Sequence, residues 1–228
     1  MKRMKMNKKT LYFGIAGVGA FLFLLLIILL KTVDVAAVGP MGTSVGFSGI
    51  NASFQAAHTF NKTFYTISKL LGVLTIATAA FFAGVGVFQW IKRKKLLKVD
   101  LEIRVLAVLY AAIVVLYVFF EKVVINYRPM IMPDGDAPEP SFPSTHTFLV
   151  CMIMGSAIFV FNRLIKNDML RTIAQIACGV IIVVMIVSRL LSGVHWLTDI
   201  IGGVLLSTAL VFAYAGVVTK KHGKRKSH

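Results

Sequence analysis

The chain has 228 residues, of which 57% are hydrophobic and only 15% are charged. Soluble domains carry charge on about a quarter of their residues, so this composition excludes an ordinary soluble domain. Apolar runs of about 20 residues, the length that a helix needs to cross a bilayer, predict an integral membrane protein.

Six apolar segments are candidate membrane spans: Leu11–Leu30, Leu70–Ile91, Val105–Phe120, Thr147–Phe161, Ile173–Val187 and Ile200–Val218. The fourth and fifth are short, so we expect both to extend into flanking residues. Backbone groups in hydrocarbon must be hydrogen-bonded internally, which favours helices. The first run is too long for the apolar part of a signal peptide, so we expect a retained anchor. The predicted fold class is all-α: a polytopic membrane protein with six transmembrane helices in one bundle, as a single domain over residues 1–228.

The net charge of +16 is unevenly distributed along the chain. Five basic residues precede the first span, five lie in Lys92–Lys98, five follow the last span, and Arg163, Lys166 and Arg171 separate the fourth and fifth spans. Six spans place all of these on one side, and the positive-inside rule makes that side the cytoplasm. We therefore expect a multi-pass protein of the cell (plasma) membrane with cytoplasmic basic tails, residues 1–10 and 219–228. Attraction to anionic membrane lipids explains these clusters better than binding of nucleic acid does.

Three connections remain for the opposite side, and two of them are rich in polar groups. The first, Lys31 to about Lys69, predicts turns followed by a short interfacial segment. The other two, Glu121 to His146 and Ser188 to Asp199, bring a set of polar side chains to one membrane face. Each alone is compatible with a snorkelling arginine or an interfacial histidine, but six together predict a functional site. The six are Arg128, Ser144, His146, Arg189, His195 and Asp199.

The spacing of His195 and Asp199 indicates a catalytic pair. Residues four apart on a helix share a face, so the carboxylate can accept a hydrogen bond from one imidazole nitrogen. That bond leaves the other nitrogen free to act as a nucleophile or a base. Asp199 also precedes the last span, where the positive end of a helix dipole favours an anion.

The remaining groups are suited to a phosphate. The planar forks of Arg128 and Arg189 match phosphate oxygens. Ser144 with nearby backbone amides adds donors, Gly193 permits close backbone approach, and His146 can protonate a leaving oxygen. This combination predicts phosphoryl transfer without a metal or another cofactor. The acidic residues of the loop, Asp134, Asp136 and Glu139, lie among prolines and make a metal site the less favoured alternative.

Three short motifs resemble the signatures of the type 2 phosphatidic acid phosphatase superfamily, from the third span onward. "SRLLSGVHWLTD" (Ser188–Asp199) matches the third signature, "PSTH" (Pro143–His146) the second, and "RP" (Arg128–Pro129) the end of the first. The resemblance implies that His195 forms a phosphohistidine, that Asp199 orients it, and that His146 protonates the leaving group. It implies a phosphate-binding set of Arg128, Ser144, Thr145, Arg189, Gly193 and Lys122.

One position departs from the first signature, which has a lysine seven residues before the arginine. Glu121 stands there, and the lysine follows at Lys122. If the third span stays helical to Arg128, Glu121 faces the phosphate beside it. We favour the other case, in which the backbone leaves helical geometry before Pro129 and Lys122 reaches the site. Snorkelling of Lys122 to the interface is a third possibility.

The sequence thus predicts a membrane phosphatase acting on a lipid phosphate or diphosphate at the outer face. The candidate substrates are undecaprenyl diphosphate, phosphatidylglycerol phosphate and phosphatidate. The alternatives are a lipid phosphotransferase of the same family and a non-catalytic helical membrane protein such as a transporter.

Overall fold

The structure is a computed structural model that describes residues 7–132 and 135–219. Within those residues it is helical, with no strand beyond two isolated bridges. Asp134 and most of the two basic tails lie outside the described residues. Seven α-helices follow one another along the chain: α1 (Lys8–Thr32), α2 (Ser48–Ala57), α3 (Lys62–Arg93), α4 (Leu101–Lys122), α5 (Thr145–Leu164), α6 (Asp168–Leu191) and α7 (Leu197–Val218).

Six of these helices, all except α2, are long and apolar enough to cross a membrane. The predicted fold class, an all-α bundle of six spans, is therefore confirmed. The two short apolar runs extend as expected, since α5 covers Thr145–Leu164 and α6 covers Asp168–Leu191. Asparagines begin three of the helices: Asn7, Asn61 and Asn167 each accept a hydrogen bond from a first-turn backbone N–H. Such caps satisfy donors that have no partner inside the helix.

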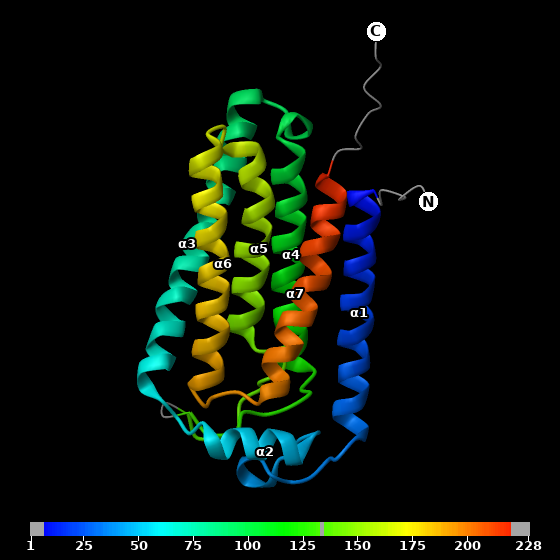
Figure 1. The fold of residues 1–228 in the computed structure, drawn as a ribbon, viewed down its shortest axis with the longest axis vertical. Helices are drawn as coiled ribbons and strands as arrows, with labels where there is room; N and C mark the ends of the chain where they lie inside the picture. The colour runs from blue at the N-terminus through cyan, green and yellow to red at the C-terminus, as the bar shows by residue number, and fades with distance from the viewer. Residues whose placement is uncertain (1–6, 133–134, 220–228) are drawn as a thin grey trace, which may run out of the picture.

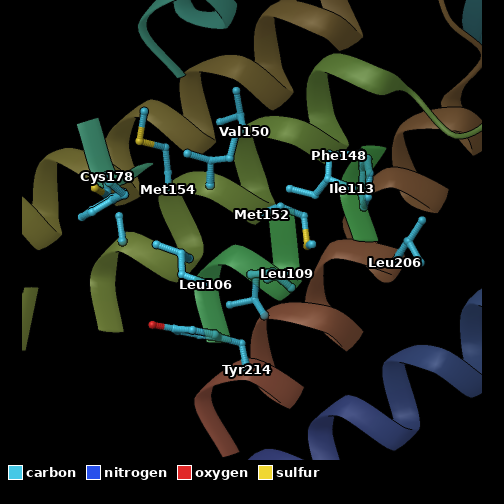
Figure 2. Packing of buried hydrophobic residues seen from close by; sticks show 14 of the residues in the cluster. Leu106, Leu109, Ile113, Phe148, Val150, Met152, Met154, Cys178, Leu206 and Tyr214 are labelled. Atoms are coloured by element: carbon cyan, nitrogen blue, oxygen red, sulfur yellow. The ribbon is translucent and has the colours of Figure 1, made fainter. Parts of the chain in front are cut away.

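Helix α5 occupies the middle of the bundle, and α7 lies between it and α1 (Figure 1). Its buried side chains interlock with those of α4, α6 and α7, as Figure 2 shows for part of the core. The labelled members are Leu106, Leu109, Ile113, Phe148, Val150, Met152, Met154, Cys178, Leu206 and Tyr214. This packing fixes the positions of the helices relative to one another along the bundle axis.

Helix α2 crosses one end of the bundle, close to the ends of the long helices (Figure 1). It is the short segment expected in the first connection. Asn51 of α2 is fully buried, and its side-chain amide donates to the hydroxyl of Thr198 at 3.0 Å. The backbone N–H of Thr198 in turn donates to the side-chain oxygen Oδ1 of Asn51 at 3.3 Å. Helix α2 therefore supports the first turn of α7, next to the predicted site.

The connections alternate between the two ends of the bundle. The end that carries α2 also carries the α4–α5 and α6–α7 connections, whereas the α3–α4 and α5–α6 connections lie at the other end (Figure 1). The basic clusters Lys92–Lys98 and Arg163–Arg171 consequently lie opposite the predicted site. This separation by ends is the arrangement that the charge distribution requires.

Candidate active site

His195 and Asp199 meet at the start of α7, although not as residues of one helix face. His195 lies in the loop before the helix, and its Nδ1 is 3.4 Å from Oδ2 of Asp199 in the first turn. The same oxygen accepts a hydrogen bond from the backbone N–H of Trp196 at 3.1 Å. The histidine is 2% exposed and the aspartate 0%. The loop thus folds back over the helix N-terminus and turns the Nε2 atom of His195 away from the carboxylate.

Asn126 holds the second oxygen of that carboxylate, and the sequence did not single it out. Its side-chain amide donates to Oδ1 of Asp199 at 3.3 Å, and its backbone carbonyl accepts from Ser141 at 2.9 Å. The residue is 1% exposed. An asparagine two positions before Arg128 was the available signal in the sequence, but nothing local indicated that it would be buried or would reach α7.

Arg128 faces the free nitrogen of His195. Its Nη1 lies 3.4 Å from Nε2 of His195 and donates to the backbone carbonyl of Val194 at 3.3 Å. Its Nε pairs with Oε2 of Glu139 at 2.9 Å. Glu139 therefore fixes the guanidinium from the loop side, while the opposite edge remains directed at the imidazole.

Arg189 approaches the site from the last turn of α6. It is 1% exposed, and its Nη1 donates to the hydroxyl of Ser68 in α3 at 3.2 Å. Its guanidinium carbon lies 5.9 Å from the ring centre of Tyr65. The Nε atom is buried without a hydrogen-bond partner among the described residues. A buried donor without a partner is costly, so this atom marks a position at which a bound acceptor would be stabilised.

The electrostatic surroundings keep the imidazole of His195 neutral. Burial lowers its pKa well below the usual value for histidine, and the positive charges of Arg189 and Arg128 lower it further. A neutral imidazole retains the lone pair that a nucleophile needs. The two arginines thus do two things here: they offer donors to an anion and they disfavour protonation of His195.

The second signature begins α5. Ser144 precedes the helix, and its backbone N–H donates to the carbonyl of Asp199 at 3.0 Å. Its hydroxyl accepts from Thr147 at 3.1 Å. Thr145 and His146 form the first turn, where unpaired backbone N–H groups and the helix dipole favour an anion. The contact between Ser144 and Asp199 joins the start of α5 directly to the start of α7.

The backbone conformation at Gly193 and its close contact with a neighbouring segment both require a glycine. Its φ is +69°, and a Cβ there would lie 2.6 Å from the backbone carbonyl of His58. Its own carbonyl accepts from the side chain of Gln55 at 2.9 Å. The glycine therefore allows the α6–α7 loop to contact the end of α2. Direct backbone access to a phosphate stays a prediction.

An apolar groove between α3 and α5 leads to His146. It has a volume of about 570 Å³ and is open along its side. Its lining residues are Lys69, Gly72, Val73, Ile76, Ala77, His146, Leu149 and Val150. A Cβ on Gly72 would lie 3.2 Å from Cδ2 of His146, so this glycine leaves room for the imidazole at the end of the groove.

Comparison with known proteins assigns this arrangement to a family. The family model of the PAP2 superfamily matches residues 102–222, which include all three signatures. The chain belongs to the PAP2 superfamily. A search of curated proteins found no match. The fold is similar to the crystal structure of a transmembrane PAP2-type phosphatidylglycerolphosphate phosphatase from Bacillus subtilis, with a TM-score of 0.61 and 22% identity. That alignment covers 87% of this chain and 94% of the other.

The chain is thus a multi-pass membrane protein, as predicted from its apolar runs. Its PAP2 membership places it in a phosphatase family, as predicted from the signatures. Among the described residues, no three His, Cys, Asp or Glu side chains lie together as a metal-ligand set.

Helix α3 contributes residues that the PAP2 signatures do not contain. Ser68 holds Arg189, Tyr65 lies against its guanidinium, and Lys69 lines the groove that ends at His146. Lys69 also lies over the ring of Tyr65 at 5.2 Å. In the sequence these residues come directly before an apolar run and belong to no motif. The packing of α3 against α5 and α6 brings them to the site.

The departure from the first PAP2 signature has a partial explanation in the structure. The α4 helix ends at Lys122, so the favoured expectation that the backbone leaves helical geometry before Arg128 is confirmed. Lys31 holds this non-helical segment by donating to the carbonyl of Ile125 at 2.8 Å. Glu121 and Lys122 are both exposed, and the carboxylate that pairs with Arg128 belongs to Glu139.

A contribution of Lys122 to the phosphate site stays a prediction with a direct test. We expect Lys122→Ala to raise KM, lower turnover and reduce kcat/KM about fivefold, because one cation near an anionic headgroup contributes about 1 kcal/mol. Glu121→Gln should change little. Initial rates of phosphate release from a lipid phosphate measure both variants. A crippled Glu121→Gln beside an unaffected Lys122→Ala would assign the role to the glutamate instead.

Proposed function

We propose that the protein hydrolyses a lipid phosphate or diphosphate through a phosphohistidine formed at His195. The observation that carries this proposal is the environment of that histidine. Its Nδ1 faces Asp199 and its Nε2 faces Arg128. Arg189, which is buried, has a donor with no partner in the described part of the chain. A neutral nucleophile between two guanidiniums is suited to attack on an anionic phosphoryl group.

In the first step, the lone pair of His195 Nε2 attacks phosphorus. A P–N bond forms and the P–O bond to the leaving group breaks. Arg128 and Arg189 stabilise the charge on the phosphoryl oxygens, and Asp199 stabilises the imidazolium through Nδ1. His146 gives a proton to the departing oxygen, which is an alkoxide for a monoester and a phosphate for a diphosphate.

In the second step, water cleaves the phosphohistidine. His146, now neutral, accepts a proton from the water as its oxygen attacks phosphorus. The P–N bond breaks, His195 recovers its lone pair, and inorganic phosphate leaves. A lipid phosphotransferase would differ only at this step, with another hydroxyl in place of water.

The α3–α5 groove supports a lipid as the substrate. Its walls are mainly aliphatic, it is open along the side of the bundle, and it ends at the histidine that would protonate the leaving group. A chain lying in the groove would leave its phosphate beside the arginines. The PAP2-type relative of known structure is described as a phosphatidylglycerolphosphate phosphatase. We therefore place phosphatidylglycerol phosphate beside undecaprenyl diphosphate and phosphatidate as the candidate substrates.

Phosphate release from these three lipids by the purified protein tests the proposed function. The proposal requires release of inorganic phosphate from at least one of them, with the dephosphorylated lipid formed in equal amount. Formation of a phosphorylated acceptor without inorganic phosphate would make the protein a phosphotransferase. Absence of both products with all three lipids would favour a non-catalytic role.

Obstruction of the groove should discriminate between lipid and soluble substrates. Ala77 is exposed on α3 and lines the groove. We expect Ala77→Phe to lower kcat/KM for the lipid substrate about tenfold or more, since the ring occupies the volume of several methylenes. Hydrolysis of p-nitrophenyl phosphate, which has no chain, should change less than about twofold. Ala80→Phe, one turn further along the same helix, is the matched control. Equal losses on both substrates would contradict a chain-binding groove.

We further propose that the site faces the cell exterior, because the basic clusters lie at the opposite end of the bundle. In a protein with both native cysteines replaced, Asp136→Cys should react with a membrane-impermeant thiol reagent on intact cells. Lys95→Cys, at the other end, should react only after permeabilisation. The reverse pattern would place the site and its substrate in the cytoplasmic leaflet.

A further inference from the structure

A second groove lies at the end of the bundle opposite the active site, between α3 and α4. It has a volume of about 380 Å³ and is largely apolar. On α3 the lining extends from Phe82 to Trp90. At about 1.5 Å per residue, this stretch of helix is about 12 Å long. On α4 it extends from Ile103 to Tyr110. The dimensions fit part of an acyl chain lying along the helices.

One charged residue lies in this groove. Arg104 belongs to the first turn of α4, and its Nε is buried without a hydrogen-bond partner among the described residues. The nearby carboxylate of Asp100 is already engaged, since it pairs with Arg93 at 2.9 Å and with Arg163 at 3.4 Å. Gln89 donates to the other oxygen of the same carboxylate at 3.0 Å. A bound acceptor would satisfy this buried Nε–H donor, for which the described residues supply no partner.

The rim of the groove adds further positive charge. The connection that closes it contains Leu96, which lines the groove, together with Lys94, Lys95 and Lys98. These lysines are exposed. Trp90 lines the groove and is 52% exposed. Such exposure is expected of an aromatic residue at the level of the lipid headgroups. The apolar groove thus contains a half-buried guanidinium, and the connection that closes the groove carries three exposed lysines.

We propose that this groove is a binding site for an anionic phospholipid. One acyl chain lies between α3 and α4, the phosphodiester accepts hydrogen bonds from Arg104, and the lysines of the rim favour lipids with a net negative charge. The site is distinct from the active site in position and chemistry. No bond is made or broken in it, so the lipid acts as a structural ligand of the α3–α4 pair. The proposal does not depend on the function proposed above.

The two tryptophans of the chain provide a direct assay. Trp90 lines the groove, whereas Trp196 is 2% exposed and lies at the opposite end. In proteoliposomes of phosphatidylcholine, a brominated lipid quenches Trp90 when its acyl chain occupies the groove. We expect brominated phosphatidylglycerol to quench more strongly than brominated phosphatidylcholine at the same mole fraction. Arg104→Gln should lower the relative binding constant of phosphatidylglycerol about fivefold, the contribution of one cation near an anionic lipid.

Two controls make the result specific. Arg171→Gln removes one positive charge from the same end of the bundle, where Arg171 pairs with Asp168, and should retain the preference for phosphatidylglycerol. His195→Ala should also retain it, because lipid bound at the active site does not contact Trp90. Equal quenching by the two lipids in the unmodified protein would overturn the proposal, and so would an unchanged preference in Arg104→Gln.

A second pair of variants tests the groove without changing any charge. Ala107 is exposed on α4 and lines the groove, whereas Ala111, one turn further, is exposed and does not. Ala107→Phe should fill the groove and remove most of the preference, while Ala111→Phe leaves it intact. This comparison still applies if Arg104→Gln does not fold. A preference that persists in Ala107→Phe would place the anionic lipid elsewhere on the bundle.

Discussion

Replacement of His195 by alanine is expected to lower turnover by about four orders of magnitude or more. The variant lacks the nitrogen that would form the P–N bond. Lipid binding should persist, because the arginines and the α3–α5 groove are unchanged. Phosphate release under saturating lipid measures the first effect. Trapping of a phosphorylated, acid-labile intermediate in the unmodified protein, and its absence in the variant, measures the mechanism itself.

His58→Ala is the matched control, since His58 lies at the same end of the bundle outside the site. Its ring stacks on Phe54 with centres 4.3 Å apart. This variant should keep its turnover within about threefold. Vanadate, which resembles a phosphoryl group during transfer, should inhibit the unmodified protein, and EDTA should not. Activity that EDTA removes and a divalent ion restores would contradict the metal-independent mechanism.

Asp199→Asn is expected to produce the second-largest loss, about 10²-fold or more in kcat. Asparagine preserves the size of the side chain, but it can present an N–H instead of an oxygen to His195 and so favour the wrong tautomer. It also removes the negative charge that stabilises the imidazolium after attack. The effect should fall on kcat, with KM within about threefold, because Asp199 contacts His195 and, in the proposed mechanism, does not contact the substrate.

Asn126→Ala tests the support behind that pair. It removes the donor to Oδ1 of Asp199 and leaves the hydrogen bond from Trp196 to Oδ2 in place. A loss of about tenfold in kcat is expected, smaller than for Asp199→Asn. An Asp199→Asn protein with turnover close to that of the unmodified protein would show that His195 needs no carboxylate, and the proposed orientation of the imidazole would be wrong.

The membrane spans could be predicted from the sequence because hydropathy is a local property. A run such as Ile200–Val218 has to be helical in hydrocarbon whatever its neighbours are. The separation of basic clusters from the candidate site followed from the number of spans alone. The sequence also predicted that α4 would end before Arg128, because Pro129 disfavours helical backbone at the residue that precedes it. The helix ends earlier than this local effect requires, at Lys122.

The signature motifs could also be identified in the sequence, since each lies within a short stretch. The geometry of the site could be predicted less well. His195 and Asp199 meet because a loop folds back on the first turn of α7, and not because two residues four apart share a helical face. From the sequence, Gly193 was predicted to let a ligand approach the backbone closely. In the structure its φ of +69° and its contact with the carbonyl of His58 supply a separate packing reason.

The sequence by itself thus determined that the chain is a six-span helical membrane protein, and it predicted a phosphate-binding cluster at one end. Only the tertiary structure decided which residues surround that cluster. Asn126 on Asp199, Glu139 on Arg128 and Ser68 on Arg189 are all contacts between segments distant in the chain. The same is true of the α3–α4 groove around Arg104. Hydropathy and motif spacing describe neighbours along the chain, whereas these partners are set by how whole helices pack against α5 and α7, which no local pattern encodes.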